Sequence, residues 1–266
     1  ATVRFCVDTE AGIAQAAAAY SADDPAAVLL EIDTGHGRCG VRYDSDAVPA
    51  RAQQVIDAAS LRLVGVLTHA GQSYAGPDAS ETPEEALRRA SHQETHRILE
   101  AAARIYAEAA PPVAKSDFTV STGSTPSMRY FENTERDGLS ITEIRPGNYV
   151  FYDAMQHTLG VCPLDYCALT AYTQVVSRHR MPNGTERVFV DAGKKVFTTD
   201  TGAQTSGFGI ALYNAAFMRK HPHVQITNLS EEHGWMQVPG GATMGVGDRL
   251  RIVPNHACVT VATQPV

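Results

Sequence analysis

The stretch Ala27-Val28-Leu29-Leu30-Glu31-Ile32-Asp33, followed directly by Thr34-Gly35-His36-Gly37-Arg38-Cys39-Gly40, indicates how the chain folds. The first seven residues are mostly apolar, which is typical of a parallel strand that is buried on both faces. The residues after them are small or polar and rich in glycine, which marks a turn. The pair predicts a buried sheet whose strands end in chemically active turns.

The same alternation of strand and helix extends on both sides of this stretch. Further strands are expected at residues 3–7, 62–69, 118–121 and 141–144, and helices near residues 10–20, 46–58 and 83–110. Such alternation implies parallel strands joined by right-handed crossovers. A closed barrel of this kind needs eight strands, and about five are found here. Residues 1–160 are therefore expected to form an α/β domain, part of a (β/α)8 TIM-type barrel.

The second half of the chain changes character. Short alternating runs occur at residues 168–176, 187–190, 195–199, 224–228, 249–253 and 258–262. Turn sequences such as Pro182-Asn183-Gly184 separate them. Residues 161–266 are therefore expected to form a small antiparallel β domain.

Composition narrows the possible partners. The net charge of -7 argues against nucleic acid as a main partner. No apolar run approaches the roughly 18 residues of a membrane helix, so no membrane partner is expected. The five cysteines are irregularly spaced and odd in number, which favours reduced thiols in a cytoplasmic protein over a disulfide framework.

Polar residues gather where the expected strands end, which is where the active residues of a parallel barrel lie. Backbone N–H groups of Gly123-Ser124-Thr125 and Gly147-Asn148-Tyr149 can hold a phosphate group. His69 can lie against a flat ring. The side chains able to bond ring substituents are Arg38, Arg145, Tyr74 and Tyr149. This set indicates pyridoxal phosphate, although flavin mononucleotide satisfies the same physics.

A second candidate site lies near the C-terminus, in Pro254-Asn255-His256-Ala257-Cys258. In an extended segment residues i and i+2 face the same side, so His256 and Cys258 can present a nitrogen and a sulfur together. Both are good zinc ligands, and two ligands leave positions open for water or substrate. The pair therefore indicates a catalytic metal, with a buried cysteine beside a surface histidine as the simpler alternative.

Several motifs resemble those of one enzyme family. The segment Ile32 to Gly40 resembles the Asp-Thr-Gly segment of the alanine racemase-like, fold type III pyridoxal phosphate enzymes, among which the D-serine dehydratase and D-threonine aldolase family is the best match. The supporting segments are His69 to Tyr74, Gly123 to Ser127, Pro146 to Asp153, Asp191 to Gly193, Gly207 to Gly209, Glu231 to Gly234 and His256 to Cys258. Dehydratases of this family typically carry His-x-Cys where aldolases carry His-x-Asp, so Cys258 favours a dehydratase.

The resemblance implies a homodimeric lyase that uses pyridoxal phosphate and zinc to convert D-serine into pyruvate and ammonia. It implies that Arg38 contacts the phenolic oxygen of the cofactor and that His69 stacks on its ring. It assigns zinc to His256 and Cys258, and places Arg145 near the ring nitrogen. The residues assigned to the phosphate are Gly123, Ser124, Thr125, Gly147, Asn148 and Tyr149.

Two alternatives stay open: a D-threonine or 3-hydroxyaspartate lyase of the same family, and a non-catalytic cofactor-binding remnant. The family's Schiff-base lysine precedes the arginine segment, and none of the chain's lysines matches its position. These lysines are Lys115, Lys194, Lys195 and Lys220. We therefore expect an upstream segment that supplies the lysine, and we expect residues 1–266 alone not to catalyse.

Overall fold

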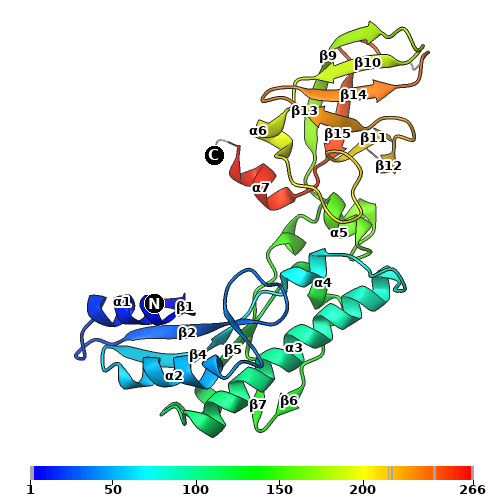
Figure 1. The fold of residues 1–266 in the computed structure, drawn as a ribbon. Helices are drawn as coiled ribbons and strands as arrows, with labels where there is room; N and C mark the ends of the chain where they lie inside the picture. The colour runs from blue at the N-terminus through cyan, green and yellow to red at the C-terminus, as the bar shows by residue number, and fades with distance from the viewer. Residues whose placement is uncertain (1–2, 215, 217, 242–243, 265–266) are drawn as a thin grey trace. The chain divides into compact units, whose positions relative to one another are not determined.

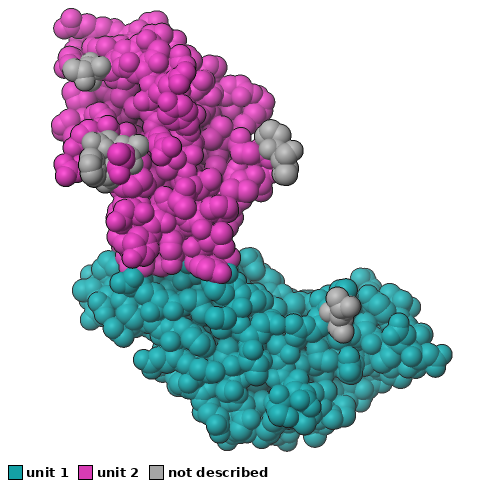
Figure 2. All heavy atoms as spheres, turned by 180° about the vertical axis from the view of Figure 1, so that it is seen from behind, with its two compact units in different colours: residues 1–73, 77–146 teal, residues 74–76, 147–266 magenta. Residues whose placement is uncertain are grey.

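The computed structural model describes residues 3–214, 216, 218–241 and 244–264 (Figure 1). The chain divides into two compact units, which Figure 2 colours separately. The N-terminal unit comprises residues 1–73 and 77–146, and the C-terminal unit comprises residues 74–76 and 147–266. The domain boundary expected near residue 160 stays a prediction.

The N-terminal unit is built on a parallel sheet. Its strands are hydrogen-bonded in chain order: β1 (Arg4–Val7), β2 (Ala26–Asp33), β4 (Leu61–Leu67), β5 (Thr119–Thr122) and β8 (Glu143–Ile144). The short β3 (Val41–Arg42) also pairs with β2 in parallel. This series confirms the expected α/β class and partial barrel.

Helices and short turns connect these strands. They are α1 (Glu10–Ala19), α2 (Ala47–Asp57), η1 (Gly71–Tyr74), α3 (Pro83–Glu108), η2 (Lys115–Asp117) and α4 (Thr125–Met128), with a small hairpin of β6 (Glu135–Arg136) and β7 (Leu139–Ser140). The long α3 begins at a capping box, in which Glu85 N–H donates to Thr82 Oγ1 over 3.2 Å and Thr82 N–H donates to Glu85 Oε2 over 2.8 Å. It packs against α2, β4 and β5.

The core of this unit explains why the apolar runs become strands and helices. Leu30, Ile32, Val66, Ile98 and Phe118 are all almost fully buried in one hydrophobic cluster. Burying a side chain of this size stabilises the fold by roughly 1.5–3 kcal/mol. In this cluster, side chains of the helices pack against those of the sheet, whereas the residues that follow the strand ends are mostly polar.

The C-terminal unit is a mainly antiparallel β structure. Its elements are η3 (Asn148–Val150), α5 (Ala154–Thr158), η4 (Leu164–Tyr166), β9 (Ala171–Arg180), β10 (Glu186–Val190), α6 (Lys194–Phe197), β11 (Ile210–Asn214), β12 (Arg219–Lys220), β13 (Ile226–Leu229), β14 (Gly234–Val238), β15 (Arg249–Val253) and α7 (Ala257–Ala262). The seven strands pair in the order β12-β11-β15-β9-β10-β14-β13. The expected antiparallel β architecture is confirmed.

Two expected strands in this unit are wrong. Residues 195–199 and 258–262 contribute to the short helices α6 and α7 instead. In α7 the β-branched run Val259-Thr260-Val261 favours a strand by propensity, but the Asp153 carboxylate binds the Ala257 N–H over 2.9 Å and so supports the first turn of a helix. Tertiary contact overrides local preference here. The strand geometry assumed for His256 and Cys258 is therefore also wrong.

Two further expectations concern the chain's surroundings. None of the cysteines in the described residues is joined in a disulfide, and Cys162 and Cys167 are buried, which agrees with the expectation of reduced thiols. Within the described parts of the chain, no helix combines the length and the apolar character needed to cross a membrane.

Candidate functional site

The candidate residues divide between the two units. The N-terminal unit holds Arg38, His69, Gly123, Ser124, Thr125 and Arg145. The C-terminal unit holds Tyr74, Gly147, Asn148, Tyr149, His256 and Cys258. The candidates of the N-terminal unit all follow the carboxyl ends of its parallel strands.

The loop after β2 is shaped by one carboxylate. Asp33 Oδ1 accepts hydrogen bonds from the backbone N–H groups of Gly35, His36 and Gly37, at 2.8, 2.9 and 3.1 Å. This turn presents Arg38, which is exposed. Arg38 and His69 line the same small pocket. The Asp-Thr-Gly segment thus positions an arginine at the end of the strand.

His69 links the ends of β4 and β5. Its Nδ1 lies 2.9 Å from the carbonyl oxygen of Gly123 and must carry the proton, because a carbonyl only accepts. Burial lowers the pKa of His69 below its ordinary value, so the imidazole is neutral at neutral pH. Its ring meets that of His36 edge-on, with centroids 6.2 Å apart.

Arg145 holds three strand ends together. Its Nε donates to Ser121 Oγ over 2.8 Å, and Nη2 donates to the carbonyl oxygen of Thr68 over 2.5 Å. Its backbone also crowds the turn after β5: a Cβ built on Gly123 would lie 2.6 Å from the Arg145 nitrogen, and Gly123 has φ of +152°. Only glycine fits that turn without a shift.

The turn after β5 rests on a residue that the sequence analysis missed, Glu94 of α3. Its carboxylate is 1% exposed and accepts from Gly123 N–H over 2.7 Å and from Ser127 Oγ over 2.6 Å. Burial is the main cause that raises the pKa of Glu94, and these two hydrogen bonds oppose it. The available signal was its helical spacing, because Glu94 falls on the same face as the buried Ala90 and Ile98.

Hydroxyl groups complete this turn. Ser124 Oγ lies 2.9 Å from Ser73 Oγ and 2.9 Å from Ser127 Oγ. Ser124 is the N-cap of α4, and Thr125 begins that helix. Ser124 and Thr125 are buried, so the turn is a rigid, polar and sheltered element.

In the C-terminal unit, one carboxylate joins two candidate segments. Asp153 Oδ1 accepts from Gln156 N–H over 3.0 Å, and Oδ2 accepts from both the Asn148 side-chain amide and Ala257 N–H, the latter over 2.9 Å. The same amide nitrogen of Asn148 lies 3.8 Å from Cys258 Sγ. Asp153 thus connects Asn148 with the start of α7, a role that its sequence motif does not predict.

The remaining candidates of this unit differ in exposure. Gly147 and Tyr149 are exposed, and Asn148 is buried. Tyr74 is half-buried, and burial, with a smaller effect of the Asp153 charge, raises its pKa to about 12. Its phenol is therefore protonated throughout the neutral range.

His256 and Cys258 lie at the beginning of α7. His256 is its N-cap and is half-buried, and Cys258 is exposed. The imidazole Nδ1 of His256 lies 2.8 Å from Asp200 Oδ2, a partner that the sequence analysis also missed. Across the described ranges, no group of three or more His, Cys, Asp or Glu side chains is arranged to hold a metal, so this pair offers two ligands at most.

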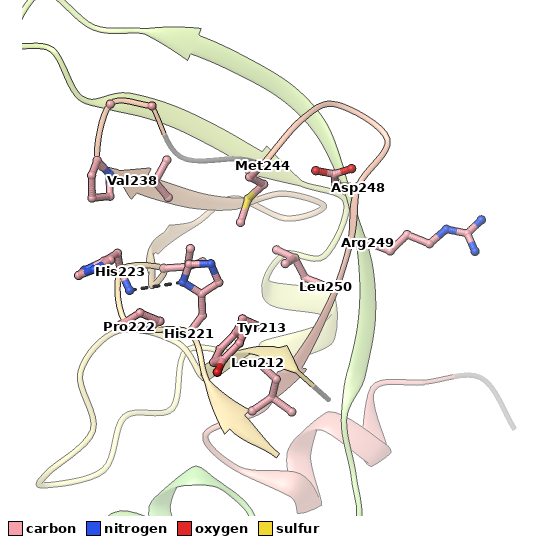
Figure 3. Close-up of a pocket in the computed structure, with 14 residues that line it drawn as sticks. Leu212, Tyr213, His221, Pro222, His223, Val238, Met244, Asp248, Arg249 and Leu250 are labelled. Atoms are coloured by element: carbon pink, nitrogen blue, oxygen red, sulfur yellow. Dashed lines mark hydrogen bonds between the residues drawn. The ribbon is translucent and has the colours of Figure 1, made fainter. Parts of the chain in front are cut away.

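A cavity of about 860 Å³ lies elsewhere in the C-terminal unit (Figure 3). It is lined mainly by apolar side chains such as Met244 and Leu250, with His221 and His223 at one side. His223 N–H donates to His221 Nδ1 over 3.4 Å. None of the candidate residues lines this cavity.

Two families of known proteins match this chain. The alanine racemase N-terminal domain family matches residues 1–154, and a serine dehydratase domain family matches residues 168–266. A D-threo-3-hydroxyaspartate dehydratase from Delftia sp. (strain HT23) is 34% identical over 99% of this chain and 67% of its own length. A D-serine dehydratase from Dictyostelium discoideum is 26% identical over 88% of this chain and 58% of its own length.

Solved structures give the same result. The Delftia enzyme superposes with a TM-score of 0.81 at 32% identity, over 98% of this chain and 67% of that one. A D-threo-3-hydroxyaspartate dehydratase with a cysteine-to-alanine change, solved in a metal-free form, superposes with a TM-score of 0.80 at 32% identity, over 98% and 67%. The chain thus spans about two thirds of the length of these relatives. It belongs to the D-serine dehydratase and D-threonine aldolase-like family of alanine racemase-like proteins.

Proposed function

We propose that this chain supplies most binding residues of a pyridoxal phosphate- and zinc-dependent lyase that removes the β-hydroxyl group of a D-amino acid, with D-serine as the first candidate substrate. One observation carries the proposal: a neutral His69, a fixed Arg145 and the Gly123 turn are bonded to one another or to neighbouring strands at one end of the parallel sheet. That end is where such folds bind their ligands.

The residues of the N-terminal unit suit pyridoxal phosphate. The His69 ring is uncharged and held by Gly123, as a group that stacks on a flat ring should be. Two guanidinium groups, those of Arg38 after β2 and Arg145 after β8, follow carboxyl ends of the parallel sheet and can bond polar ring substituents. One earlier assignment changes: Gly123 N–H already donates to Glu94, so we assign Gly123 to turn geometry instead of phosphate binding.

Phosphate binding then falls to the backbone N–H groups of Ser124 and Thr125 in this unit, because Ser124 Oγ is already bonded to Ser73 and Ser127. In the C-terminal unit it falls to Gly147, Asn148 and Tyr149, with Asn148 acting through its backbone, because its amide nitrogen donates to Asp153. A Cβ built on Gly147 would meet no atom within 4 Å, so that segment leaves room for a ligand.

His256 and Cys258 suit zinc. An imidazole whose Nδ1 is bonded to a carboxylate keeps Nε2 for a metal, and an exposed thiol two residues later adds a sulfur ligand. When bound, pyridoxal phosphate would supply an electron sink for the charge at the substrate Cα, and zinc would supply a Lewis acid for the departing hydroxyl oxygen. Tyr74, protonated at neutral pH, is available as a hydrogen-bond donor.

A second candidate substrate is D-threo-3-hydroxyaspartate. The Delftia enzyme that acts on it is 34% identical to this chain, compared with 26% for the D-serine dehydratase of Dictyostelium. Both substrates carry a β-hydroxyl group, so the same site would serve either.

The test uses the native protein from its own source, with D-serine, D-threo-3-hydroxyaspartate and D-threonine as substrates. Elimination yields pyruvate from serine and oxaloacetate from hydroxyaspartate, whereas aldol cleavage of threonine yields glycine. We expect elimination that a chelator abolishes and zinc restores, and a pyridoxyl label after borohydride reduction. In Cys258→Ala, zinc should no longer restore elimination. In Cys6→Ala, a change at another exposed cysteine, zinc should restore it as in the wild type. Turnover without label or metal would contradict the proposal, and absence of both label and turnover would favour a non-catalytic remnant.

A further inference from the structure

The partner of His256 comes from a distant loop. Asp200 lies between α6 and β11, 56 positions before His256, and its Oδ2 is 2.8 Å from the imidazole Nδ1. A carboxylate accepts hydrogen bonds at neutral pH, so Nδ1 carries the proton in this contact. The proton-free nitrogen of the neutral ring is then Nε2.

A separate contact holds this loop in place. The side chain of Asn255, which is 1% exposed, donates through Nδ2 to the carbonyl oxygens of Asp200, over 2.9 Å, and Gly207, over 2.8 Å. The residue next to His256 therefore fixes the backbone that carries the Asp200 carboxylate. The imidazole and its partner are positioned by two contacts instead of one.

The approach to Asp200 is conformationally costly. Thr198 has φ of +57° and ψ of -168°, a region that residues other than glycine rarely occupy. Holding such a residue there costs about 1–3 kcal/mol, and strain of this kind clusters at functional sites. This strained residue lies two positions before Asp200. An incidental surface contact of the carboxylate would not require a strained backbone there.

We propose that Asp200 is the positioning residue of His256: it fixes the Nδ1–H form of the ring and aims Nε2 at the metal. The metal itself rests on the function proposed above, but the form of the ring does not. Hydrogen-bonded partners of this kind orient histidine ligands and increase their basicity, and their loss typically weakens metal binding by about 10- to 100-fold. Asp200 is assigned as the partner of the ring, through Oδ2, and not as a metal ligand.

The first measurement needs no metal. With isotope-labelled histidine, nuclear magnetic resonance of the metal-free native protein at mildly alkaline pH should find His256 protonated at Nδ1. The variant Asp200→Ala should lose this preference, whereas Asp200→Asn should largely keep it, because an amide oxygen also accepts. A wild-type His256 protonated at Nε2 would overturn the assignment.

The second measurement is zinc affinity by competition with a chelator. We expect Asp200→Ala to bind zinc about 10- to 100-fold more weakly than wild type, with Asp200→Asn in between. Glu232→Gln, which removes an exposed carboxylate of the same unit, should leave affinity unchanged. An Asp200→Ala affinity within about threefold of wild type would overturn the role toward the metal. If wild type binds no zinc, the proposed function fails, and the tautomer result alone decides the role of Asp200.

Discussion

Glu94 offers a sharp test of the strand-end site, because one of its oxygens accepts from Gly123 N–H and the other accepts from Ser127 Oγ. In Glu94→Ala, Ser127 Oγ still has Ser124 as a partner, at 2.9 Å, but Gly123 N–H loses its acceptor. A stranded buried donor costs about 1–3 kcal/mol, and the lost Cγ methylene adds about 0.8 kcal/mol. We expect the N-terminal unit to lose roughly 2–4 kcal/mol of stability in total.

Glu94→Gln is the matched control. Its amide oxygen can still accept from Gly123, and its NH2 group can donate to Ser127 Oγ, so stability should stay within about 1 kcal/mol of wild type. The two variants also separate charge from hydrogen bonding. Because burial raises the pKa of Glu94, the folded unit binds this proton more tightly than the unfolded chain. The resulting stability is present below the ordinary pKa of a glutamate and is lost as pH rises through the raised pKa, and Glu94→Gln should lack this dependence.

The assay is hydrogen exchange followed by mass spectrometry on peptides that cover residues 119–128. At 1.4 kcal/mol for each factor of ten, the Ala variant should exchange roughly 30- to 700-fold faster. Trp235, the chain's one tryptophan, lies in β14 of the C-terminal unit, so its fluorescence in urea provides an internal control. Exchange in Glu94→Ala within about threefold of wild type would refute the role assigned to this carboxylate.

Three further predictions test other parts of the structure. Gly123→Ala places a Cβ 2.6 Å from the Arg145 nitrogen and should destabilise the N-terminal unit by about 2–4 kcal/mol. In the control Gly138→Ala the Cβ would meet only Lys115 Cδ, at 3.7 Å, and the loss should be about 1–2 kcal/mol. Equal losses in thermal unfolding would contradict the crowding argument. Burial lowers the pKa of His69, so the contribution of this residue to stability is present above the ordinary histidine pKa and is lost as pH falls from that value toward the lowered pKa. His69→Asn should abolish this acid sensitivity, and a pH profile of hydrogen exchange that the variant leaves unchanged would contradict the prediction. Asp153→Ala removes the acceptor of Gln156 and Ala257 N–H groups and should destabilise the C-terminal unit by about 2–5 kcal/mol in urea titrations followed by Trp235 fluorescence, with a loss within experimental error of zero as the contrary result.

The elements that the sequence predicts well are those whose local pattern and burial agree. The apolar run at Ala27 to Asp33 is a buried parallel strand, and residues 249–253 form β15 with the expected bounds. The polar turns at Arg38, His69 and Arg145 follow parallel strands, so the strand-end argument is confirmed for their position. Their roles toward a cofactor stay predictions.

The elements that the sequence does not predict depend on distant partners. The start of α7 is supported by Asp153, which is 104 positions away from Ala257, and no local pattern in Val259-Thr260-Val261 signals that contact. Likewise Asp200 reaches His256 through a loop with no motif of its own. Glu94 was detectable by helical spacing, but a glutamate on a buried face is uncommon, and periodicity alone does not reveal its acceptors.

The carboxylate of Asp153 also couples the effects of mutations at different residues. It accepts from the Asn148 side chain and from the backbone beside Cys258, and Asn148 itself approaches the Cys258 sulfur. Residues that share a partner in this way are energetically coupled, so their effects do not add. The effect of a substitution at Asn148 will therefore depend on the residue at position 258, and the reverse also holds. Only a double-mutant cycle can separate the two effects.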